Sequence, residues 1–292
     1  MHAHTQWIHT SDQQRLYVKS WGKPDNPALV LVHGYPDNQE VWEAVIAQLI
    51  QDFYIVTYDV RGAGQSSIPK HIRDYRLARL SEDLLTVVDA VLPNRPFHLA
   101  AHDWGSIQSW ESVTDARFRQ RILSYSSISG PCLDHAAFWM RAQLQQGKKA
   151  KFLKQLGKSW YIAVFQLPLL APTVWQYMSA ERWGKMVQQL EQRPGLALNP
   201  NIQQDGQYGV NLYRANFIPR LLKPRQRVAI CPVQAVVLTE DRFVSPELID
   251  EVPNWAADFQ RVEIAANHWA ILSQPERIAQ PLRDFAFSKS GS

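Results

Sequence analysis

The segment AHDWG at residues 101–105 combines an acidic side chain with small neighbours in a way that could do chemistry. A nucleophile on a sharp turn between a strand and a helix has a strained backbone, so small residues are needed two positions to either side. Ala101 and Gly105 supply them around Asp103. The apolar run FHLAA precedes the aspartate, and a helical pattern follows it. Asp103 is therefore the candidate nucleophile. The simpler alternative is that it only caps the following helix.

An aspartate nucleophile suits attack on a saturated carbon. A carboxylate that attacks an acyl carbon would form a reactive anhydride. Attack on a saturated carbon instead displaces an alkoxide or a halide and leaves a stable alkyl ester. Water must then cleave that ester at its carbonyl carbon, which needs a general base and an oxyanion hole.

His268, in the segment AANHWAILSQPERI, is the candidate general base. It follows the last expected strand, at the sheet edge where open α/β sheets bind their ligands. Asp241, in VVLTEDRFVSP, lies just beyond the preceding strand and is the expected orienting acid. The order nucleophile, acid, histidine along the chain is that of the α/β hydrolases. Asp134 competes for the orienting role because it also follows a strand, and Glu240 is a weaker candidate.

The oxyanion hole is expected in the segment HGYP at residues 33–36. Its donors are the backbone N–H groups of Tyr35 and of Trp104, the residue after the nucleophile. Pro36 has no N–H to donate. His33 and His102 are expected to be structural, hydrogen-bonding histidines.

Apolar, β-branched runs at 28–32, 54–58 and 97–101 are typical of buried parallel strands. Helical patterns at 41–49, 80–91 and about 274–285 alternate with them, which indicates βαβ units and a mainly parallel sheet. The expected strands are 28–32, 54–58, 97–101, 122–128, 233–238 and 259–264.

Residues 131–224 interrupt this alternation. The stretch is helical in pattern, rich in Trp, Tyr, Gln and Leu, and contains several prolines. Because strand patterns resume after it, we interpret it as a helical cap inserted into one domain. The predicted core then consists of residues 1–130 and 225–292.

The overall composition excludes several classes of function. The chain has 292 residues, 46% hydrophobic and 20% charged, with a net charge of +4 that is too mild to indicate nucleic-acid binding. The basic run at 147–158 is interpreted as a solvated helix face rather than a membrane or polyanion patch. Cys132 and Cys231 fit neither a metal pattern nor a disulfide framework.

The expected location is the cytoplasm. No stretch approaches the roughly 18 apolar residues of a membrane span, and the first residues lack an apolar signal core. We expect a soluble protein with no stable membrane insertion, no metal and no organic cofactor; a homodimer is left open.

Together the motifs resemble the α/β-hydrolase superfamily and, within it, the epoxide hydrolases, over nearly the whole chain. The resemblance implies an α/β-hydrolase fold, with a mainly parallel sheet flanked by helices and an inserted helical cap. The matching segments are HGYP, YDVRGAGQSS at 58–67, AHDWG, TEDRFVSP and NHWAILSQPERI.

The same resemblance implies two cap tyrosines that hydrogen-bond the epoxide oxygen. SWYIAVFQLP at 159–168 is similar to the first such segment and VNLYRAN at 210–216 to the second, which gives Tyr161 and Tyr213. A phenol with a pKa of about 10 stays neutral at pH 7 and can donate to an alkoxide. The implied substrate is a small hydrophobic epoxide, attacked by Asp103 and then released by water as a diol. The segments look most like bacterial epoxide hydrolases that have relatives fused to a short-chain dehydrogenase, but no glycine-rich dinucleotide turn occurs here.

Other functions fit part of the pattern. A haloalkane dehalogenase or a related aspartate-nucleophile hydrolase would share the elbow, with Trp104 and a cap tryptophan such as Trp139 or Trp160 binding halide. Such enzymes usually have asparagine where this chain has Tyr35, and the tyrosine pair would be unexplained. Hydrolysis of a β-lactone is a smaller possibility. A non-catalytic binding protein with this fold would not need an intact nucleophile, acid and histidine.

Overall fold

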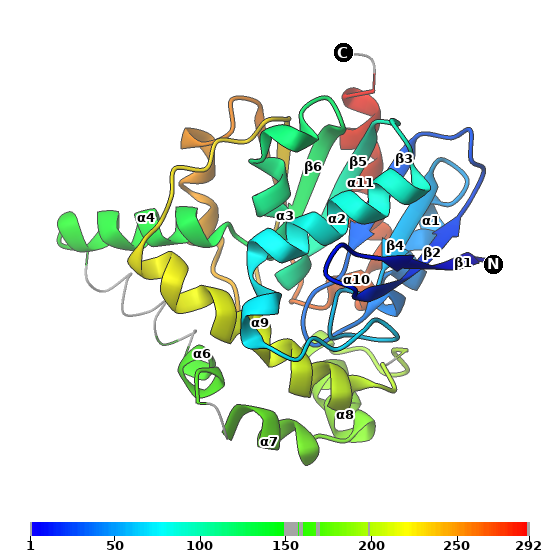
Figure 1. The fold of residues 1–292 in the computed structure, drawn as a ribbon. Helices are drawn as coiled ribbons and strands as arrows, with labels where there is room; N and C mark the ends of the chain where they lie inside the picture. The colour runs from blue at the N-terminus through cyan, green and yellow to red at the C-terminus, as the bar shows by residue number, and fades with distance from the viewer. Residues whose placement is uncertain (1, 149–156, 158–159, 168–169, 198, 291–292) are drawn as a thin grey trace.

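A computed structural model describes residues 2–148, 157, 160–167, 170–197 and 199–290 of the chain (Figure 1). Its centre is an eight-stranded sheet with the strand order β1-β2-β4-β3-β5-β6-β7-β8. The strands are β1 (His4–His9), β2 (Arg15–Trp21), β3 (Ala28–Val32), β4 (Tyr54–Tyr58), β5 (Phe97–His102), β6 (Ile122–Ile128), β7 (Val233–Leu238) and β8 (Phe259–Ile264).

The six strands β3 to β8 pair in parallel, as the apolar runs predicted. Every residue of β3, β5 and β7 is buried, because helices cover both faces of the sheet. The observed strand boundaries match the predicted ones, except that β5 continues by one residue to His102. The expected mainly parallel sheet flanked by helices is confirmed.

The first two strands, β1 and β2, were not predicted from the sequence. They pair antiparallel with each other, and β2 pairs antiparallel with β4. In β2, the buried Leu16 and Val18 alternate with Arg15, Tyr17 and Lys19, which are more exposed. A search for continuous apolar runs misses such half-buried strands at the edge of a sheet.

Helices from different parts of the chain cover the two faces of the sheet. Alternate residues of a strand point to opposite faces. Leu29 and Leu31 of β3 therefore pack in one hydrophobic cluster, with α1 (Glu43–Leu49) and α11 (Pro275–Ser288). Val30 and Val32 pack in another, with α2 (Leu77–Val91) and α3 (Trp104–Val113).

All described helices of residues 131–224 lie between β6 and β7 in the chain. They gather at one side of the molecule, below and to the left of the sheet in Figure 1. No strand occurs in the described part of this range. The predicted domain limits at 130/131 and 224/225 stay a prediction, and most of the basic run at 147–158 lies outside the described residues. These helices are α4 (Leu133–Gln145), α6 (Trp160–Phe165), α7 (Leu170–Gln176), α8 (Ala180–Glu191) and α9 (Ile202–Leu222).

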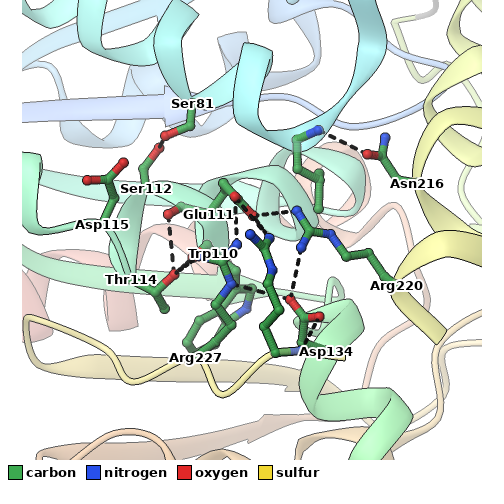
Figure 2. A network of polar contacts seen from close by, with 12 residues as sticks. Ser81, Trp110, Glu111, Ser112, Thr114, Asp115, Asp134, Asn216, Arg220 and Arg227 are labelled. Carbon is green, nitrogen blue, oxygen red and sulfur yellow. Dashed lines mark hydrogen bonds and ion pairs between the residues drawn. The ribbon is translucent and has the colours of Figure 1, made fainter. Parts of the chain in front are cut away.

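An ionic cluster joins both ends of this helical segment to α3, a helix that packs on the sheet (Figure 2). Glu111 of α3 accepts hydrogen bonds from Arg220, Arg225 and Arg227, at 2.6–3.1 Å. Asp134, at the start of α4, accepts from the backbone N–H of Arg225 at 2.9 Å and lies 3.4 Å from Nε of Arg227. The cluster thus connects the segment that leaves β6 with the segment that returns to β7.

No helix in the described parts of the chain combines the length and the apolar character needed to cross a bilayer.

Candidate active site

Asp103 lies on a strained turn between β5 and α3. Its φ of 52° and ψ of −124° place a non-glycine residue in a sparsely populated backbone region. Although Asp103 occupies the N-cap position of α3, its side chain makes no capping hydrogen bond. The capping alternative is therefore wrong, and the carboxylate is available for other contacts.

Gly105 and Gly34 allow the backbone to pack tightly around this turn. A Cβ atom on Gly105 would lie 2.2 Å from the carbonyl oxygen of Val32, and one on Gly34 would lie 2.6 Å from Oδ1 of Asp103. Both distances are far below van der Waals contact. The requirement for small residues near the nucleophile thus has a direct steric cause.

The backbone N–H of Tyr35 donates a hydrogen bond of 2.8 Å to Oδ1 of Asp103. Trp104 is the first residue of α3, where backbone N–H groups have no acceptor within the helix. The loop before Tyr35 is held by His33, whose Nε2 accepts from the N–H of Val60 at 2.9 Å. The two expected oxyanion donors therefore flank the candidate nucleophile.

His268 lies between two carboxylates. Its Nδ1 is 2.8 Å from Oδ2 of Asp241, and its Nε2 is 3.5 Å from Oδ2 of Asp103. Oδ1 of Asp241 accepts from the N–H groups of Phe243 and Val244, at 2.7 and 3.0 Å. The carbonyl oxygen of His268 also accepts from Nε2 of His102, at 2.8 Å. The orienting position is occupied by Asp241.

The competing acids lie elsewhere. Asp134 belongs to the ionic cluster, with Arg220 and Arg227 as partners (Figure 2). Glu240 is exposed. Both aspartates follow strands in the sequence, so only the three-dimensional arrangement separates Asp241 from Asp134.

The charges of the three residues depend on one another. Burial alone lowers the pKa of His268, but the carboxylates of Asp241 and Asp103 outweigh it and hold the pKa well above its ordinary value. Burial raises the pKa of Asp241, but His268 and the two backbone N–H groups bring it below its usual range. Both shifts favour an imidazolium at His268 beside an ionised Asp241.

A cavity of about 720 Å³ opens in front of Asp103. Its walls combine residues of the sheet domain with residues of α4, α6 and α9. The polar lining consists of Asp103, Tyr161, Gln166 and Tyr213, and the rest of the lining is apolar apart from the backbone. The apolar lining comes from Trp104, Ile107, Pro131, Leu133, Ala136, Met140, Trp160, Ile162, Ala163, Phe217, Ile218, Leu221, Phe243, Val244 and Leu248.

Tyr161 of α6 and Tyr213 of α9 meet at this cavity, with ring centroids 6.1 Å apart and ring planes at 80°. The ring of Tyr213 also packs on Trp104, at 4.7 Å. Burial raises the pKa of both phenols well above 10, and the charge of Asp103 adds to the effect. Both hydroxyl groups therefore remain neutral hydrogen-bond donors.

Two residues of the site were missed from the sequence. Nε2 of Gln166 donates to the carbonyl oxygen of Tyr213 at 3.3 Å and so links the two tyrosine helices. The ring of Phe243 lies edge-on to His268, at 5.2 Å, and to Tyr161, at 6.0 Å. Phe243 stands two positions after Asp241, and this spacing is too common in sequences to identify a site residue.

Of the three tryptophans considered for a halide site, two line the cavity and one does not. Trp104 and Trp160 line the cavity. Trp139 is instead buried in a small cluster with Ala136 and Leu248. A pair of indole groups facing one anion would therefore have to come from Trp104 and Trp160.

Comparison with known proteins identifies similar chains. The family described as "alpha/beta hydrolase fold" matches residues 27–275. A Mycobacterium tuberculosis protein named "Probable oxidoreductase EphD" is 32% identical over 289 residues, which cover 96% of this chain and 49% of that protein. The chain thus spans about half the length of this relative. Epoxide hydrolase 3 of Xenopus tropicalis is 24% identical over 284 residues, covering 92% of this chain and 73% of that protein.

Solved structures show the same fold. An epoxide hydrolase from Bacillus megaterium in complex with an inhibitor has a TM-score of 0.77 and 22% identity, covering 96% of this chain and 99% of that one. The epoxide hydrolase VrEH1 from Vigna radiata has a TM-score of 0.75 and 19% identity, covering 98% of each chain. At these identities the likeness establishes the arrangement of the elements.

Proposed function

Since the chain belongs to the alpha/beta hydrolase fold family, we propose that it is an epoxide hydrolase that forms a vicinal diol through an alkyl ester on Asp103. One observation carries the proposal: a carboxylate on a strained turn and two neutral phenols line the same apolar cavity. Relatives named as epoxide hydrolases support the same activity.

In the first step, Oδ2 or Oδ1 of Asp103 attacks the less hindered carbon of the epoxide. The C–O bond of the ring breaks, and its electron pair goes to the epoxide oxygen. This oxygen accepts hydrogen bonds from the hydroxyl groups of Tyr161 and Tyr213, which stabilise the alkoxide or protonate it. An alkoxide is a poor leaving group, so the reaction requires such donors.

In the second step, His268 takes a proton from water, and the water oxygen attacks the ester carbonyl carbon. The N–H groups of Tyr35 and Trp104 stabilise the resulting oxyanion. Collapse of this intermediate breaks the bond to the substrate oxygen, which takes a proton from the imidazolium of His268, and the diol is released. The second proton of the attacking water replaces the one given to the alkoxide, and the carboxylate of Asp103 is restored. Asp241 orients the imidazole and stabilises its positive charge.

The charges described above suit this order of events. In the resting protein the pKa of His268 is raised by the carboxylate of Asp241 and also by the carboxylate of Asp103. Ester formation removes that negative charge, so the pKa of His268 must fall once the substrate is attached. Once its proton has passed to the alkoxide, directly or through the phenols, the neutral imidazole can accept a proton from water.

A single turnover in ¹⁸O-labelled water tests the mechanism. Water attacks the carbonyl carbon of the ester, so the label must enter the carboxylate of Asp103, and the first diol must carry no label. Mass spectrometry of the diol and of the peptide that contains Asp103 gives both results. Labelled diol with an unlabelled peptide would mean direct attack of water on the epoxide, and the ester mechanism would have to be abandoned.

A comparison of substrates tests the activity itself. Styrene oxide, a fatty-acid epoxide and a bromoalkane are incubated separately with the protein, and Asp103→Asn is the matched control. We expect diol from an epoxide, and none from the variant. Turnover of the bromoalkane alone would favour a dehalogenase, and no turnover of any of the three would favour a binding protein.

A further inference from the structure

The loop that carries His268 is held by the C-terminal end of α8, a helix from the segment between β6 and β7. Nδ2 of Asn267 donates to the carbonyl oxygen of Leu190 at 3.1 Å. The backbone N–H of Trp269 donates to Oε1 of Glu191 at 2.8 Å. Residues on both sides of the histidine are therefore bonded to the last turn of the same helix.

Glu191 makes a second contact beyond the histidine. Its Oε2 accepts a 2.5 Å hydrogen bond from Oγ of Ser273, the last residue of α10 (Ala270–Ser273). Trp269 is the N-cap residue of α10 and has no side-chain capping bond of its own. One carboxylate thus bridges both ends of the short helix that follows the histidine.

The sheet domain holds the same loop from the other side. Nε1 of Trp269 donates to Oδ2 of Asp37 at 3.0 Å. The ring of Trp269 also packs against Trp183 of α8, at 5.5 Å, and against the imidazole of His268, at 4.8 Å. The histidine loop is therefore clamped between α8 and the loop that carries the oxyanion donor Tyr35.

We propose that Glu191 is a positioning residue for the general base: its carboxylate fixes the backbone next to His268 and so places Nε2 for hydrolysis of the ester. This inference rests on the proposed function. Asp103 is positioned by its own turn and by the N–H of Tyr35, and Glu191 contacts neither. Loss of Glu191 should therefore slow the step in which His268 takes a proton from water. The rate of attack by Asp103 on the epoxide should not change.

Single-turnover kinetics with styrene oxide separate the two steps. The intact mass of the protein in quenched samples is measured by mass spectrometry, which detects the ester as an increase equal to the mass of one substrate molecule. In Glu191→Ala we expect the ester to form at the rate of the unmodified protein and to decay more slowly, on the order of tenfold, because a small misplacement of a base is costly. The fraction of protein held as ester during steady turnover rises accordingly.

Two further variants separate positioning from general stability. Glu191→Gln keeps an acceptor for Trp269 and an amide that donates to Ser273, so its decay rate should return close to that of the unmodified protein. Glu181→Ala, at the other end of α8, removes an exposed side chain paired with Lys185, and both steps should be unchanged. Where Glu191→Ala gives no folded protein, Ser273→Ala removes one of the two bonds, and we expect a smaller slowing of decay alone.

Several outcomes would overturn the inference. One is an ester decay rate that is unchanged in folded Glu191→Ala. Another is an equal slowing of ester formation and ester decay in that variant. The same two outcomes apply to Ser273→Ala if Glu191→Ala does not fold. Failure of Gln to restore the rate would also count against positioning by hydrogen bonds. If the unmodified protein itself forms no ester, the proposed function fails, and that result is visible before any Glu191 variant is measured.

Discussion

Nε2 of His268 lies 3.5 Å from Oδ2 of Asp103, so the candidate base and the candidate nucleophile are in direct electrostatic contact. The pair explains how one histidine can be charged in the resting protein and neutral when a base is needed. Before the reaction, the carboxylates of Asp241 and Asp103 both raise the pKa of the imidazole. In the proposed ester the charge of Asp103 is gone, which lowers the pKa of His268 and favours the neutral base.

The first prediction concerns the histidine itself. His268→Gln removes the base but leaves Asp103 and both tyrosines in place, so the ester should form and persist. Intact mass spectrometry after mixing with styrene oxide should show an increase equal to one substrate. His102→Gln serves as a comparison, because this histidine hydrogen-bonds the carbonyl oxygen of His268 and its other ring nitrogen has no partner among the described residues. An unmodified mass in His268→Gln would argue against its role as the base.

The second prediction concerns Asp241 and pH. The base must be neutral, so ester decay accelerates as pH rises through the pKa of His268. The carboxylate of Asp241 raises that pKa, so Asp241→Asn should move the acid limb of decay to lower pH. The plateau should also fall, by roughly a hundredfold, because the imidazole loses its orientation.

Asp134→Asn is the control for this pH experiment. Its carboxylate lies in the ionic cluster and does not contact His268. We expect the decay profile to keep its acid limb and its plateau. If Asp134→Asn shifts the limb and Asp241→Asn does not, the orienting acid has been assigned to the wrong residue.

The third prediction concerns the phenols. Tyr161→Phe combined with Tyr213→Phe should slow ester formation from an epoxide by roughly 10²- to 10⁴-fold, the range for loss of general acid catalysis. Decay of any ester that does form should change much less. Halide departure needs no proton, so turnover of a bromoalkane, if present at all, should survive the substitution. Unimpaired epoxide opening in the double variant would remove the tyrosines from the mechanism.

Much of the arrangement could be predicted because the chemistry lies at the ends of strands. Asp103, Asp241 and His268 each follow a predicted strand, and the carboxyl ends of parallel strands meet at one edge of a sheet. The antiparallel β1 and β2 were missed because one side of each is solvated, so their apolar residues alternate with polar ones. The local pattern thus revealed the six parallel strands and neither of the antiparallel ones.

Contacts between distant segments could not be predicted in the same way. Glu191 and Trp269 are 78 positions apart, and nothing in either local sequence indicates that they meet. Asp134 and Asp241 both follow a strand, so the sequence favoured Asp241 without excluding Asp134. Their roles separate only when the arginines of the ionic cluster are placed beside Asp134.

The fourth prediction concerns the tight packing under the nucleophile. A Cβ atom on residue 105 would lie 2.2 Å from the carbonyl oxygen of Val32 and 2.4 Å from that of His33. Both are backbone atoms, so Gly105→Ala must displace either α3 or the end of β3. We expect a loss of roughly 1–3 kcal/mol in the free energy of unfolding, as for other overpacked sites.

The same displacement moves Asp103 relative to the N–H of Tyr35, which follows β3, so ester formation should slow as well. Urea denaturation measures the free energy of unfolding. An unchanged m value would show that the unfolding of Gly105→Ala and that of the unmodified protein are comparable. Gly157→Ala is the matched control, because a Cβ atom there would meet nothing within 4 Å in the described parts of the chain. Equal stability of the two variants would mean that the turn relaxes easily, and the strain at Asp103 would then have no role in holding the nucleophile.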